Sequence, residues 1–103
     1  MPTADAYDRR QRVHDALDGV RHTVPRDLAR DVAYYLDSAQ EPELALDVLI
    51  DGIIDGRVLL SLDEFERLQH AMEACGRFGD RRLSWLEEHG MRPLAPSEDE
   101  SET

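Results

Sequence analysis

EPELALDVLIDGIIDGR, residues 41–57, carries the start, body and stop signals of one complete helix. Pro42 suits the first helical position, where the N–H that proline lacks would have no partner in any case. Gly56 suits the position just after the helix, where a left-handed backbone closes the last turn. The residues between them are apolar around most of the helix, which therefore needs neighbours on several sides. We predict that this helix lies at the centre of a small helical domain.

Carboxylates occupy the one polar line along this helix. Their four-residue spacing from Glu43 through Asp47 and Asp51 to Asp55 places all of them on one face. Glu41 lies at the edge of the same face. We call these five residues the acidic strip: Glu41, Glu43, Asp47, Asp51 and Asp55.

Four further segments have the apolar spacing of amphipathic helices. They are residues 4–20, 25–39, 62–75 and 80–89. Ser61 and Glu64 form a capping-box pattern at the start of one of them, and the spacing there places Leu62 on the inner face. No stretch alternates apolar and polar residues as a half-buried strand does. The fold class predicted is an all-α, compact bundle of four to five helices.

The chain is predicted to hold one domain. Its 103 residues are 41% hydrophobic, which is typical of a globular protein with a single core. The last residues, MRPLAPSEDESET, combine two prolines with four carboxylates. Such a composition is typical of disorder. We therefore expect a helical domain over 1–93 and a disordered acidic tail over 94–103.

The charge of the chain is strongly negative. The sequence carries 23 acidic residues against 12 basic ones, all of them arginine, for a net charge of −11. Such a surface repels phosphate groups, so the predicted partners include no nucleic acid and no membrane. It attracts a basic protein. The alternative is that the acidity serves only to keep the protein in solution.

Residue types and spacings that support catalysis or metal binding are missing from the sequence. Cys75 is the only cysteine, and the four histidines have no ligand spacing to one another or to it. A di-iron site would need Glu-x-x-His motifs opposite the acidic strip, and none exists. We therefore expect no enzyme, no catalytic residue, no metal and no cofactor. With neither a secretory signal nor a stretch of about 20 apolar residues, a cytoplasmic location is expected.

Residues 25–88 resemble small bacterial immunity proteins of the MafI type. The resemblance rests on EPELALDVLIDGIID, followed by SLDEFERL and then AMEACG before Trp85. The chain departs from the pattern at Gln40, where a glycine is often expected, and at Gly52 inside the helix. The resemblance implies a protein that binds a cognate toxin of the producing cell and blocks it without catalysing a reaction.

The charge and the resemblance together predict that the protein neutralises a toxin. The resemblance implies that such toxins include nucleases with basic surfaces, which the acidic strip would meet. The alternative is a small helical adaptor or regulatory subunit that binds another cytosolic protein through the strip and Tyr34. Tyr34 and Tyr35 point about 100° apart on a helix, so only one of them fits the core. A third reading is a structural oligomer, but a monomer is favoured.

Overall fold

The computed structural model describes residues 2–93 of the chain, with side chains from Tyr7 onward. Five α-helices follow one another along it, and the described residues hold no strand. The all-α prediction is therefore confirmed. The predicted tail over 94–103 lies outside the described residues. The helices are α1 (Pro2–Val20), α2 (Arg26–Ala33), α3 (Pro42–Asp55), α4 (Leu62–Ala74) and α5 (Arg81–His89).

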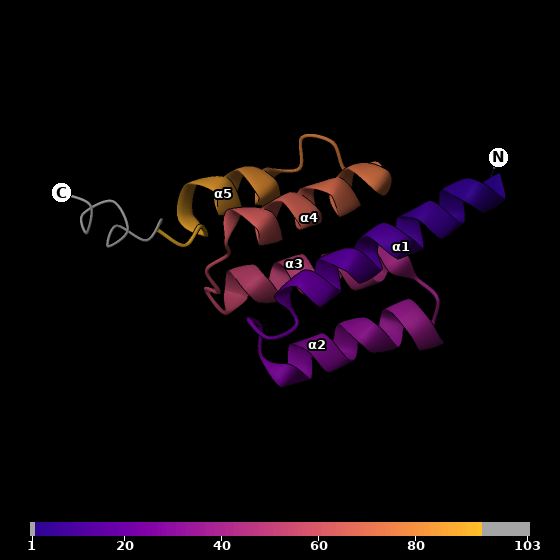
Figure 1. Cartoon of the computed structure of the whole chain (residues 1–103), viewed down its shortest axis with the longest axis horizontal. Coiled ribbons are helices and arrows are strands. Elements are labelled where there is room, and N and C mark those ends of the chain that lie inside the picture. The colour runs from indigo at the N-terminus through magenta and orange to yellow at the C-terminus, as the bar shows by residue number, and fades with distance from the viewer. Residues whose placement is uncertain (1, 94–103) are drawn as a thin grey trace, which may run out of the picture.

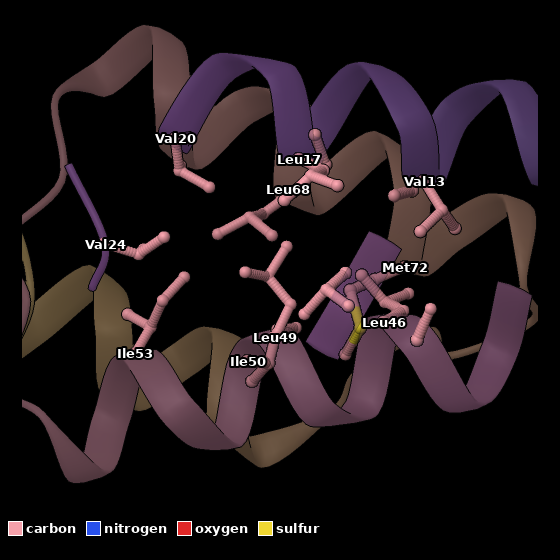
Figure 2. Close-up of a cluster of buried hydrophobic side chains, with 14 of the residues drawn as sticks. Val13, Leu17, Val20, Val24, Leu46, Leu49, Ile50, Ile53, Leu68 and Met72 are labelled. Carbon is pink, nitrogen blue, oxygen red and sulfur yellow. The ribbon is translucent and has the colours of Figure 1, made fainter. Parts of the chain in front are cut away.

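Helix α3 lies at the centre of the bundle, as its apolar surface predicts. It packs against α1, α2 and α5, and α1 packs in turn along α4 (Figure 1). Side chains of α1 and α3 point toward one another and meet those of α4 in the core (Figure 2). Burying each large aliphatic side chain stabilises the fold by about 1.5–3 kcal/mol. The buried residues of α3 are Ala45, Leu46, Leu49, Ile50 and Ile53.

Helix α2 ends in a π-helical turn, η1 (Tyr34–Ser38). The Ala39 N–H donates to the Tyr34 carbonyl five residues earlier, at 3.0 Å. Gln40 then adopts a φ of 56°, in the left-handed region that favours glycine. The sequence therefore departs from the glycine of the immunity-protein pattern, but the backbone at this position has a conformation that glycine favours.

The end of α3 differs from the prediction in one residue. Gly56 has a φ of −84°, and the left-handed residue is Arg57, with a φ of 53°. The Val58 N–H donates to the Ile53 carbonyl and the Arg57 N–H to the Ile54 carbonyl, which makes a Schellman motif. In this motif the left-handed residue is the one after the cap, and Gly56 is the cap itself.

The capping box at the start of α4 is confirmed. The Glu64 N–H donates to the Ser61 hydroxyl at 3.1 Å, and the Ser61 N–H donates to the Glu64 carboxylate at 2.8 Å. The inward placement of Leu62 is wrong, because this side chain is exposed. Side chains of a first turn lean toward the N-terminal end of their helix, so Leu62 projects toward solvent instead of the core.

Gly52 lets α2 approach α3 closely. A Cβ atom at this position would lie 2.6 Å from two methyl carbons of Leu28. The glycine inside the helix therefore has a packing reason, although glycine is a weaker helix former than alanine.

The connection between α3 and α4 joins the chain that follows α5. The Leu60 N–H donates to the Gly90 carbonyl at 2.8 Å, and the Arg92 N–H donates to the Leu60 carbonyl at 2.6 Å. Leu60 is buried beneath this contact, while its neighbour Leu59 is exposed. The two segments together cover one end of the bundle.

Candidate protein-binding surface

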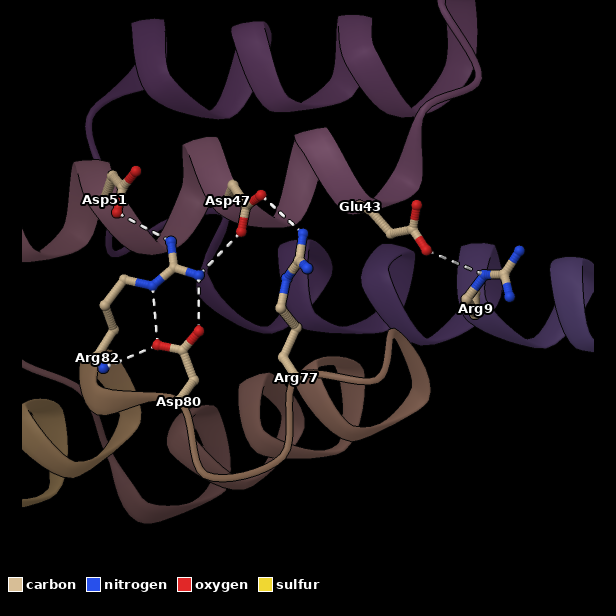
Figure 3. A network of polar contacts seen from close by, with 7 residues as sticks. All are labelled: Arg9, Glu43, Asp47, Asp51, Arg77, Asp80 and Arg82. Carbon is tan, nitrogen blue, oxygen red and sulfur yellow. Dashed lines mark hydrogen bonds and ion pairs between the residues drawn. The ribbon is translucent and has the colours of Figure 1, made fainter.

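Three residues of the acidic strip point from α3 toward arginines of other segments (Figure 3). Asp47 and Asp51 meet Arg77 and Arg82 around the start of α5, whereas Glu43 meets Arg9 of α1. Asp47, in the middle of the strip, accepts hydrogen bonds from two arginines, Arg77 and Arg82, each at 2.9 Å. Its side chain is only 29% exposed. Asp47 is therefore an internal ion-pair partner more than a free carboxylate.

Arg82 is the centre of this polar network. Its guanidinium donates to Asp51 at 3.0 Å and to both carboxylate oxygens of Asp80, also at 3.0 Å. Asp80 caps α5 by accepting the Arg82 backbone N–H at 2.9 Å. The hydrogen bonds from the Arg82 side chain lower the pKa of the Asp80 carboxyl, and those to Asp80 raise the pKa of Arg82. The network fastens the start of α5 onto α3.

The remaining strip residues differ in whether they lie close to an arginine. Glu43 lies 3.7 Å from the Nε atom of Arg9 on α1. Glu41 and Asp55 are exposed, and neither forms an ion pair with any residue between 7 and 93. The strip is thus bound to arginines along its middle and free at its two ends, which are separated by roughly 21 Å of helix.

The structure does not test the predicted role of Tyr34 in partner binding. Its side chain is exposed, while Tyr35 is partly buried against the core, so the expectation that the two cannot both belong to the core is confirmed. The two rings meet edge to face, with centroids 5.5 Å apart. This contact holds Tyr34 in place at the surface of η1.

Most arginines of the chain are already paired with its own carboxylates. Nine of the twelve lie within 4.0 Å of an Asp or Glu oxygen. Many carboxylates, by contrast, are exposed and form no ion pair within the described part of the chain. They are spread over all five helices and the residue before α3: Asp15, Asp31, Glu41, Asp55, Glu66, Glu73, Glu87 and Glu88.

No set of three or more metal-ligating side chains comes together among residues 7–93. Cys75 is buried, and burial raises the pKa of its thiol, with the Glu43 carboxylate adding to the effect. A thiol with a raised pKa is a poor nucleophile. Within the described range, no helix is both long and apolar enough to cross a bilayer.

No protein-family model, curated protein or solved structure matches this chain. The resemblance to immunity proteins therefore rests on its residues alone and stays a prediction.

Proposed function

We propose that the protein is an immunity protein, which binds a basic toxin inside the producing cell and blocks it. The observation that supports the proposal is that the surface carboxylates without an ion pair outnumber the arginines without one among the described residues. Because nine arginines are paired internally, the charges available to a partner are mostly carboxylates. A basic partner meets such a surface with long-range attraction and associates quickly. The resemblance to MafI-type proteins supports the same function.

The contact proposed for the toxin is the acidic strip, and its two free ends have the leading role. Glu41 and Asp55 meet a basic side chain without first losing an internal partner. Asp47 would have to exchange Arg77 or Arg82 for a basic group of the toxin, which gains little because one ion pair replaces another. The strip therefore binds through its ends while its middle holds the fold.

The association rate with the toxin tests this contact. The partner is the purified product of the gene directly upstream, and the variant is Glu41→Lys combined with Asp55→Lys. The matched control is Glu66→Lys with Glu73→Lys on α4, which changes the net charge equally. We expect association of the strip variant to be about tenfold slower than that of the control, and wild-type association to slow as salt is added.

Two results would count against the proposal. Equal rates for the two double variants would show that the strip makes no contact of its own. A wild-type association rate that does not depend on salt would contradict the proposal that the partner is basic.

A further inference from the structure

A groove of about 340 Å³ lies at the end of the bundle where the α3–α4 connection meets α5. In Figure 1 this is the left-hand end of the bundle, where the chain passes from α3 to α4. The groove is distinct from the acidic strip, and no carboxylate lines it, although the chain is strongly acidic. Its lining residues are Arg57, Val58, Leu59, Trp85, His89 and Gly90.

Large apolar side chains are exposed along this groove. Trp85 is 39% exposed and Leu59 is 44% exposed. The Trp85 ring stacks on His89, with centroids 5.0 Å apart and 28° between the planes. This contact limits the motion of the indole, which then offers a fixed apolar surface to an incoming group. Partly exposed tryptophans of this kind often anchor protein interfaces.

Arg57 supplies a cation at the edge of the groove. Its backbone has a left-handed φ of 53°, a conformation that costs free energy for residues other than glycine. Its guanidinium forms no ion pair with any described residue, although Asp55 is only two positions away. An arginine without an ion pair among the described residues, in a chain whose other arginines are mostly paired, points to a carboxylate from outside.

We propose that this groove binds a peptide segment in which an apolar side chain stands next to a carboxylate. The apolar side chain packs between Trp85 and Leu59, and the carboxylate accepts two hydrogen bonds from the Arg57 guanidinium. The planar fork of arginine matches a carboxylate in this way. The groove shares no lining residue with the acidic strip and is opposite to it in charge, so the proposal stands whether or not the chain neutralises a toxin.

Trp85 is the only tryptophan of the chain, so its fluorescence reports directly on the groove. The full chain is titrated with the blocked peptide acetyl-Leu-Phe-Glu-Gly-amide, and the tryptophan emission is followed. We expect a saturable shift of the emission. Peptides with Gln or Lys in place of Glu should bind about tenfold more weakly or worse, because they lose a charge-assisted hydrogen bond.

Two glycine substitutions separate binding from stability. Arg57→Gly removes the cation and also the backbone strain, so this variant should melt about 2–6 °C higher and bind the peptide about tenfold more weakly. Gln40→Gly relieves the same kind of strain at a φ of 56° away from the groove. It should melt higher by a similar amount and bind the peptide as the wild type does.

Three results would overturn the proposal. One is the absence of a saturable change with the Glu peptide, and another is unchanged affinity in Arg57→Gly. The third is a concentration-dependent dimer, seen by sedimentation and lost in Leu59→Glu, which would assign the groove to a second copy of the chain.

Discussion

Glu64 shows how one side chain can join three separate parts of the chain. Its carboxylate accepts the Ser61 backbone N–H at 2.8 Å, the Thr23 hydroxyl at 2.8 Å and the Arg92 guanidinium at 3.0 Å. The side chain is only 12% exposed. The bond to Ser61 follows from the local capping pattern. The bonds to Thr23 and Arg92 tie the α1–α2 connection and the segment after α5 to the start of α4.

Removing this carboxylate should destabilise the whole fold. We expect Glu64→Ala to lower the free energy of unfolding by about 2 kcal/mol, because the cap is lost and part-buried donors lose their acceptor. Glu66→Ala is the matched control, since Glu66 lies on the same helix, is exposed and forms no ion pair with a described residue. It should change stability by less than about 0.5 kcal/mol. Urea denaturation of both variants measures the difference, and equal losses would contradict the role given to Glu64.

At this scale the sequence predicts what depends on near neighbours in the chain. The Ser61–Glu64 capping box is such a case, because both of its bonds lie within four residues. The left-handed residue after α3 is Arg57, one position later than the Gly56 that the sequence predicts. A glycine serves equally as the cap or as the residue after it, and the choice depends on where the last turn ends. The sequence around Arg57 does not indicate a binding site, because the groove forms only when α5 packs beside the α3–α4 connection.

Among the elements, α5 depends most clearly on its surroundings. A helix of nine residues is too short to be stable alone in water. Leu86 buries its apolar side, and Asp80 and Arg82 fasten its first turn to Asp47 and Asp51 of α3. The polar network therefore stabilises α5, which is too short to gain enough stability from its own backbone hydrogen bonds.

The network should weaken in acid. The pKa of Asp80 is lower in the folded chain than in the unfolded one, so its contribution to stability is complete above the unfolded pKa of about 3.9. The contribution is lost as the pH falls through the lower, folded pKa. We expect Asp80→Asn to be less stable than the wild type by about 1 kcal/mol between pH 5 and 7. Below about pH 4 the difference should shrink.

Denaturation curves from pH 3 to 7 measure this difference. Asp27→Asn is the control, because Asp27 pairs with Arg30 at an exposed site on α2, and it should have almost no effect at neutral pH. A difference between the wild type and Asp80→Asn that stays constant down to pH 3 would mean that the ion pair with Arg82 does not stabilise the fold.

The acidic strip shows which property of a helix its own sequence does not predict, namely the ion pairs that it forms with distant segments. The four-residue spacing correctly places Glu43, Asp47 and Asp51 along one side of α3 (Figure 3). It gives no information about Arg77 and Arg82, which lie 30 and 35 positions after Asp47. The same spacing is compatible with a free surface, a metal site or an internal ion-pair network. Only the docking of α5 decides that the middle of the strip is internal and its ends are free.

For the whole molecule, composition and apolar periodicity predict the helix content and the central place of α3. Helix α3 carries eight apolar residues, and only a central position in the bundle can bury most of them. How α1, α2 and α5 pack against it depends on contacts between distant residues, such as Leu28 against Gly52, which no periodicity reveals. The net charge of −11 is also read from the sequence, but its distribution is not. Internal pairing of most arginines leaves the outside more uniformly acidic than the composition alone suggests.

Neutralisation of a toxin is the central claim, and the growth of cells that express the gene directly upstream tests it most directly. Growth is measured after induction of that gene alone and together with this chain. We predict that growth stops in the first case and is restored in the second, because the two proteins associate before the toxin acts. Continued arrest while both proteins accumulate in the soluble fraction, or normal growth with the upstream gene alone, would contradict the claim.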